Sequence, residues 1–346
     1  MDFQENNNQQ DPTQIQPIAP MYVPEKKRKG SFQRIFWGII LGLSFLANIT
    51  LFIMLIGVGM LVMTGQRSTL IEDVIREGPM GTKIAVVSID GVIYAEQAEV
   101  VYQQLKAARK DKQVKAVIVR VDSPGGTVTA SDQIHQEILK FREKTNKPVI
   151  AFMQGTAASG GYYTSVACEK IIAEPTTITG SIGVISSYLV LEELLEDKLG
   201  VLPVVIKSGE KKDIPSSFRA PTEEEIEYIQ TKLIKPSLKR FVEIVADGRK
   251  ESLTLSEVET LADGSIFGAE EALEAKLIDE IGYMDDAIEL IKSIAKIGPA
   301  QVIQYRRPFS LGSLLGINST QNLLKLDRNT LYELGSPQTL YLWSAY

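Results

Sequence analysis

Residues 35–63 form an uninterrupted apolar run, which constrains the fold of this chain more than any other feature. The run contains no charged side chain, and only Ser44, Asn48 and Thr50 are polar. As a helix rising 1.5 Å per residue it would reach roughly 43 Å, more than the ~30 Å hydrocarbon core of a bilayer. A helix without a charged face has no side to present to water, and no second run of this kind follows. We therefore expect one transmembrane helix at 35–63.

A cleaved signal peptide is the main alternative to a retained anchor. The apolar region of such a peptide spans only about 7–15 residues, and no small-residue cleavage site follows this run. Four basic residues at 26–29 and Arg34 precede the run, whereas Arg67 follows it. The positive-inside rule then places the N-terminus in the cytoplasm. We expect a single-pass protein of the cell membrane, with the residues after the run on the extracytoplasmic side.

Composition excludes several classes of function. The formal net charge of −6 argues against a nucleic-acid-binding protein. The chain has one cysteine, Cys168, and one histidine, His135. These numbers exclude an intrachain disulfide and every metal site built from several Cys or His ligands. We expect no metal, no cofactor and no nucleic-acid partner.

From Lys83 onward, apolar strand patterns alternate with amphipathic helix patterns. Apolar runs separated by helices of about 10–15 residues predict parallel βα units in a sheet that helices cover on both faces. The chain is predicted to be mostly helical after Pro221. The expected strands are residues 83–93, 114–121, 148–153, 170–173 and 201–206, and the expected helices before Pro221 are residues 98–109, 131–144 and 189–199.

Two glycine-rich loops follow predicted strands, at 123–126 and 158–161. In an open α/β sheet, ligands bind beyond the carboxyl ends of the strands, where both loops would lie. Ser159 could act as a nucleophile, the N–H of Gly160 could bind one side of an oxyanion, and the paired glycines of the first loop could bind the other. The alternative for each loop is an ordinary turn or helix cap.

A serine nucleophile requires a base. His135 precedes Ser159, whereas the hydrolases with a Gly-x-Ser-x-Gly motif place their histidine last, so we expect His135 to be a surface or half-buried helix residue. The segment 207–213 supplies three lysines. A lysine base needs its pKa lowered from ~10.4 to about 7–8 by burial or by a neighbouring cation. The residues alone favour a solvated loop for this segment.

Four motifs together resemble the signal peptide peptidase A family, which comprises membrane-anchored serine proteases of the peptidase S49 type. They occur in the order and spacing of that family, and the resemblance covers roughly residues 82–297. It implies the short form of the family and an α/β, crotonase-like (Clp-protease-like) fold. Such a fold is a repeated ββα/βα superhelix with a helical C-terminal part, here preceded by one transmembrane helix. The motifs are VDSPGG (121–126), GTAASGGYY (155–163), TGSIGV (179–184) and KSGEKKD (207–213).

The resemblance also implies a role for individual residues. It makes Ser159 the nucleophile and Lys212 the general base of a Ser-Lys dyad, in which Ser181 orients the lysine. Lys211 stays open as the alternative base because the two lysines are adjacent. The backbone N–H groups implied to form the oxyanion hole are those of Gly126 and Gly160.

The expected function is hydrolysis of peptide bonds by a membrane-anchored serine endopeptidase. The resemblance implies a homo-oligomer whose substrates are signal peptides left in the membrane, or other short unfolded peptides. A crotonase-type acyl-CoA enzyme and an inactive peptide-binding scaffold remain as alternatives. The expected organisation is a disordered cytoplasmic tail with a basic flank (1–34), the transmembrane helix (35–63), a linker (64–81), the protease domain (82–300) and a C-terminal segment for docking or oligomer contact (301–346).

Overall fold

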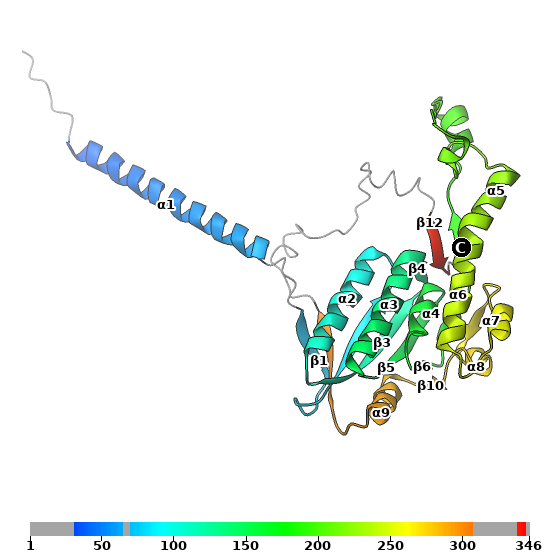
Figure 1. Ribbon diagram of the computed structural model, residues 1–346. Helices are drawn as coiled ribbons and strands as arrows, with labels where there is room; N and C mark the ends of the chain where they lie inside the picture. The colour runs from blue at the N-terminus through cyan, green and yellow to red at the C-terminus, as the bar shows by residue number, and fades with distance from the viewer. Residues whose placement is uncertain (1–30, 65–69, 307–337, 344–346) are drawn as a thin grey trace, which may run out of the picture. The chain divides into compact units, whose positions relative to one another are not determined.

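The chain separates into two units in the computed structural model, which is drawn in Figure 1. One unit ends at Gln66 and contains helix α1, and the other, Arg67–Tyr346, contains the sheets. The structure describes residues 31–64, 70–306 and 338–343.

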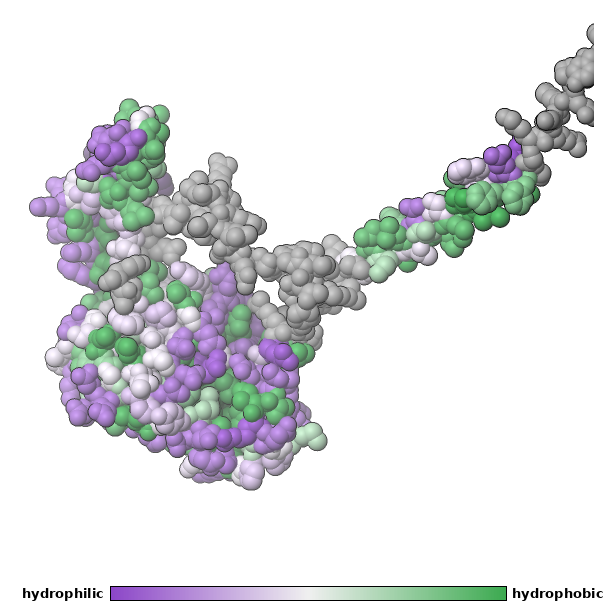
Figure 2. Space-filling view, turned by 180° about the vertical axis from the view of Figure 1, so that it is seen from behind, coloured by the Kyte–Doolittle hydropathy of each residue, from purple (hydrophilic) through white to green (hydrophobic). Residues whose placement is uncertain are grey.

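Helix α1 (Ser31–Thr64) includes the whole predicted transmembrane segment. In the described part of the chain, it is the one helix that is long and apolar enough to cross a bilayer, over Phe32–Gly57. Its large apolar side chains are exposed, and Figure 2 shows the hydrophobic surface along it. The predicted disordered tail lies outside the described residues except for residues 31–34, which belong to α1.

The centre of the main sheet is parallel, as the alternating patterns predicted. Four strands lie side by side in the order β2, β3, β5 and β6. Each consists largely of buried apolar residues, because helices cover both faces of the sheet. Their bounds are β2 (Lys83–Asp90), β3 (Val114–Ser123), β5 (Val149–Ala158) and β6 (Lys170–Ala173).

The sheet continues beyond the predicted domain bounds of 82 and 300. Strand β11 (Gln301–Arg306) pairs parallel with β2, and β1 (Ile71–Arg76) pairs antiparallel with β11. At the other end, β10 (Glu280–Ile281) pairs parallel with β6. The expected linker and the expected C-terminal segment therefore each contribute a strand to the same sheet.

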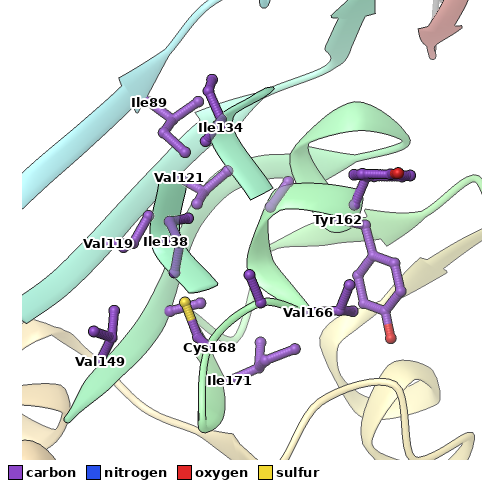
Figure 3. Close-up of a cluster of buried hydrophobic side chains, with 14 of the residues drawn as sticks. Ile89, Val119, Val121, Ile134, Ile138, Val149, Tyr162, Val166, Cys168 and Ile171 are labelled. Atoms are coloured by element: carbon purple, nitrogen blue, oxygen red, sulfur yellow. The ribbon is translucent and has the colours of Figure 1, made fainter. Parts of the chain in front are cut away.

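Alternate residues of the central strands face two separate cores. On β3, Val117, Val119 and Val121 face the core beneath helices α2, α3, α4 and α6, whereas Ala116 and Ile118 face the core beneath α9. Figure 3 shows Val119 and Val121 in the first core, close to side chains of α3. The helices are α2 (Ala95–Lys110), α3 (Val128–Thr145), α4 (Gly160–Ser165), α5 (Glu223–Ile229), α6 (Lys235–Gly248), α7 (Leu255–Leu261), α8 (Ala269–Glu274) and α9 (Met284–Ala295).

A segment between β8 (Ile185–Ser187) and α5, residues 188–222, rises above the sheet in Figure 1, and we call it the arm. Within it the predicted strand 201–206 is wrong, because these residues form neither strand nor helix. Their apolar run has the composition of a buried strand, yet Val204 is 77% and Ile206 96% exposed. The helix predicted at 189–199 is reduced mainly to a π-helical turn, Leu194–Lys198.

Candidate active site

Ser159 lies at the junction between the end of β5 and the start of α4. Its side chain is buried and its backbone has φ 53° and ψ −112°, a conformation that a residue with a side chain rarely adopts. Ser159 occupies the N-cap position of α4, but its hydroxyl makes no capping hydrogen bond. Ser159 therefore lacks the side-chain hydrogen bond that defines an ordinary helix cap, the alternative role for this serine.

Ser181 is brought beside Ser159 by the pairing of two parallel strands. Strand β7 (Ile178–Gly180) pairs with the end of β5, with Gly180 opposite Ala158. The backbone N–H of Ser159 donates to the carbonyl of Gly180 over 2.8 Å. Ser181 is also buried and also has a positive φ, 48°. Two buried serines thus leave neighbouring strands, each with a positive φ.

The two glycine-rich loops are in direct contact. A Cβ atom on Gly125 would lie 2.7 Å from the backbone nitrogen of Gly160, and a Cβ atom on Gly160 would lie 3.1 Å from the backbone nitrogen of Gly126. The Ser123 hydroxyl accepts a hydrogen bond from the Gly125 N–H over 3.0 Å and so fixes the first loop. Only residues without a Cβ allow this approach, which makes neighbours of the Gly126 and Gly160 backbones.

Ser131 is a polar residue of this region that the sequence reasoning missed. It lies on α3, is fully buried, and its Oγ has no hydrogen-bond partner in the described part of the chain. A Cβ atom on Gly160 would lie only 2.5 Å from that oxygen. The available signal was its place on the inward stripe of α3, where Ile134 and Ile138 also lie.

Lys212 is not brought to this group of residues. It lies in the 3₁₀ turn Glu210–Asp213 of the arm, with an exposed side chain. Within the described ranges, no hydrogen bond or ion pair joins its ammonium group to another residue. In Figure 1 the arm rises away from α4, at whose start Ser159 lies. The structure therefore gathers Ser159, Ser181, Gly126 and Gly160, and leaves the predicted base apart from them.

His135 is buried, so the expectation of a surface or half-buried residue is wrong. It is 3% exposed, and its ring lies edge-on to that of Tyr163 with 5.3 Å between centroids. Burial lowers its pKa to about 4, because an imidazolium loses hydration there. Among the described residues, no group of three or more His, Cys, Asp or Glu side chains converges as metal ligands would.

The C-terminal strand β12 (Gln338–Leu342) lies beside the glycine loop. It pairs antiparallel with β4 (Gly125–Thr127) on one side and with β8 on the other, and Tyr341 stands opposite Gly126. The Tyr341 ring is fully buried, with its centroid 5.0 Å from that of Tyr163, and its hydroxyl donates to the Ser237 carbonyl over 2.7 Å. Strand β12 thus pairs along one edge of the strand that carries Gly126.

Comparison with known proteins finds matches to two family profiles. The profile of peptidase family S49 matches residues 141–298, and that of Clp protease matches residues 80–177. The Clp protease match agrees with the predicted Clp-protease-like α/β fold. Together the two matched regions contain both glycine loops, Ser181 and Lys212.

Individual relatives agree with the S49 match. A protein of Enterococcus faecium, named as a candidate signal peptide peptidase SppA, is 39% identical over 246 residues, which are 68% of this chain and 70% of that protein. Protease 4 of Haemophilus influenzae is 37% identical over 60% of this chain and 34% of its own length. The chloroplastic serine protease SPPA of Arabidopsis thaliana is 35% identical over 58% of this chain and 29% of its own length. The chain therefore belongs to peptidase family S49 and is a serine-type peptidase.

Proposed function

We propose that this peptidase cleaves peptide bonds with Ser159 as nucleophile and Lys212 as general base, oriented by Ser181. The backbone N–H groups of Gly126 and Gly160 would stabilise the oxyanion. The observation that carries the proposal is the contact between the two glycine loops directly beside Ser159, because an oxyanion hole needs two backbone donors next to the nucleophile. The uncapped, positive-φ conformation of Ser159 supports the same role.

The mechanism follows from these groups. The neutral Lys212 amine takes the proton of the Ser159 hydroxyl as its oxygen attacks the scissile carbonyl. The carbonyl oxygen becomes an anion, which accepts hydrogen bonds from the Gly126 and Gly160 N–H groups. The lysine then protonates the leaving amine. In the second half, the same amine deprotonates the water that attacks the acyl-enzyme, and it returns this proton to Ser159 Oγ as the ester bond breaks.

We further propose that the enzyme is a homo-oligomer in which the arm of one copy supplies Lys212 to Ser159 of another. The separation of Lys212 from Ser159 within one chain supports this arrangement. So does the apolar surface of the arm, where Leu202, Val204 and Ile206 are 72%, 77% and 96% exposed (Figure 2). Exposed apolar surface of this kind is typical of a contact between proteins.

The proposed substrates are signal peptides left in the membrane after secretion, or other short unfolded peptides. Helix α1 would anchor the chain in the cell membrane with its N-terminus in the cytoplasm and its catalytic unit outside. The name of the Enterococcus faecium relative supports this substrate class. A buried nucleophile between two loops also favours an extended peptide over a folded protein.

A serine-reactive fluorophosphonate tests the nucleophile, and hydrolysis of a peptide that contains a signal-peptide core tests the base. We expect Ser159→Ala to abolish labelling and cleavage, whereas Ser293→Ala, at an exposed position of α9, keeps both. Lys212→Ala should abolish cleavage, whereas Lys211→Ala should only reduce it. Full activity of Lys212→Ala with loss in Lys211→Ala would assign the base to Lys211. Labelling of Ser159→Ala equal to that of the unchanged protein would overturn the nucleophile.

A further inference from the structure

The two adjacent lysines of the 3₁₀ turn have different surroundings. The Lys211 Nζ lies 4.6 Å from the centre of the Tyr228 ring on α5, a cation–π contact. Successive side chains of a 3₁₀ helix point about 120° apart, so Lys212 cannot share this contact. Among the described residues its ammonium group has no partner. The turn thus fixes one lysine against α5 and leaves the other available.

The carboxylate of Asp213, next to Lys212, is already occupied. Its Oδ1 accepts a hydrogen bond from Lys207 Nζ over 2.6 Å, and its Oδ2 lies 3.4 Å from a guanidinium nitrogen of Arg219. The Lys207 ammonium also donates to the Glu210 carbonyl at the start of the turn. The hydrogen bond from Lys207 lowers the pKa of Asp213, so this carboxylate is ionised at neutral pH.

Arg219 connects the turn to helix α5. Its guanidinium forms a two-pronged ion pair with Glu225, which also closes the capping box of α5 with Thr222. This pairing lowers the pKa of Glu225 to about 2. The side chains of Asp213 and Glu225 are only 13% and 14% exposed, so the chain of charges is partly shielded from solvent.

We propose that Asp213, Arg219, Glu225 and Tyr228 form a brace that positions the lysine turn and keeps Asp213 from pairing with Lys212. An unoccupied carboxylate beside Lys212 would hold that lysine as an ammonium ion, which cannot accept the proton of a serine. Lys207 and Arg219 neutralise the carboxylate instead. Isolated surface ion pairs add little to stability, so the role that fits this network is positioning. The inference rests on the proposed Ser159–Lys212 mechanism.

The brace can be tested by removing the charge of Arg219 in the full-length protein. We expect Arg219→Gln to lower kcat for peptide hydrolysis about tenfold with KM unchanged. The acidic limb of its pH–rate profile should move to higher pH by about one unit. Asp213 Oδ1 stays bound to Lys207, but Oδ2 loses its Arg219 partner and can then stabilise the Lys212 ammonium. Arg306→Gln is the matched control, since Arg306 pairs with Asp73 in the sheet and not in the arm.

A second variant separates positioning from simple loss of structure. Adding Asp213→Asn to Arg219→Gln removes the freed carboxylate, so the acidic limb should return toward its original pH. Two results would overturn the brace. One is an acidic limb that stays displaced in the double variant, and the other is an Arg219→Gln enzyme with unchanged kcat and pH profile. The proposed function fails separately, if Lys212→Ala keeps its activity. If Lys212→Ala is inactive while Arg219→Gln behaves like the unchanged protein, the brace is wrong and the proposed function still stands.

Discussion

The Ser159 N–H and the Gly180 carbonyl form a hydrogen bond of 2.8 Å that links the two strands from which the buried serines emerge. Gly180 has φ 77°, and a Cβ atom there would lie 2.4 Å from the ring of Phe267. Gly180→Ala should therefore displace Ser181 and the hydrogen bond to Ser159 together. We expect peptide hydrolysis to fall by about 100-fold, the loss that a small misplacement of catalytic groups can cause.

The control for this change is Gly298→Ala, because a Cβ atom at Gly298 meets open space. Both variants should be compared by the rate of peptide hydrolysis and by fluorophosphonate labelling of Ser159. If Gly180→Ala hydrolyses peptide as fast as Gly298→Ala, the spacing of Ser159 and Ser181 is unimportant for catalysis.

Gly160→Ala probes the contact between the glycine loops. The added methyl group would lie 2.5 Å from the Ser131 hydroxyl and 3.1 Å from the Gly126 nitrogen, so the loops must separate. We expect the loss of one oxyanion donor's alignment to lower kcat by about 10²–10³-fold. Ser131→Ala alone should be nearly neutral for stability, because it removes a buried hydroxyl without a partner.

The double variant Gly160→Ala with Ser131→Gly isolates the cause of that loss. It relieves the contact with Ser131 but keeps the methyl group close to Gly126. Activity should stay low if the approach of the two loops matters for oxyanion binding. Recovery of full activity would instead place the whole effect on the Ser131 contact.

The sheet and the glycine loops were predictable from sequence because their patterns are local. Buried parallel strands read as continuous apolar runs, and β3 and β5 follow that pattern directly. The loops after them need glycines because a Cβ atom would prevent their close approach, as the contact between Gly125 and Gly160 shows. Strands β1 and β11 were missed as parts of the sheet, because pairing between residues so far apart leaves no local signal.

The arm and His135 were mispredicted for different physical reasons. The run at 201–206 has the composition of a buried strand, but apolar composition does not say whether a surface faces a core or solvent. His135 lies on the inward stripe of α3, where the helical period predicts burial, although a polar ring favours the surface. The position of Lys212 relative to Ser159 depends on the path of the arm, which no periodic pattern encodes.

Mixing two inactive variants tests whether the dyad forms between copies. Ser159→Ala keeps Lys212, and Lys212→Ala keeps Ser159. If the arm acts on a neighbouring copy, co-expression in equal amounts should restore about a quarter of the original activity by random pairing in a head-to-tail ring. The measurement is peptide hydrolysis per labelled site. Absence of any restored activity, in a mixture shown to contain both variants in one oligomer, would place both residues in the same chain.

His135 makes the stability of the catalytic unit depend on pH. The folded chain holds the pKa of this imidazole at about 4, below its ordinary 6.5, chiefly because burial disfavours the charged form. The unfolded chain therefore binds more protons between these values, and the free energy of unfolding should fall as pH drops from 6.5 to 4. The loss should approach about 3 kcal/mol.

Chemical denaturation at several pH values measures this dependence. His135→Leu removes the titrating group, so its free energy of unfolding should fall less over the same interval. Carboxylates such as Asp279, whose pKa is lowered by its pairing with Arg249, lose their stabilising contribution mainly below about pH 4 and add little slope in this interval. Identical slopes for His135→Leu and the unchanged protein would contradict the assignment to His135.

Tyr341 holds β12 against the strand that carries Gly126, so its side chain should control access to that strand. Tyr341→Phe removes the hydrogen bond to Ser237 and should weaken docking of β12 by about 1 kcal/mol. Tyr341→Ala also removes the buried ring and should cost about 3–5 kcal/mol. A peptide that pairs with β4 must displace β12, so KM should fall from the unchanged protein to the Phe and then the Ala variant. Equal KM values across the three, with faster hydrogen exchange of the β12 amides in Tyr341→Ala, would show that β12 does not compete with substrate.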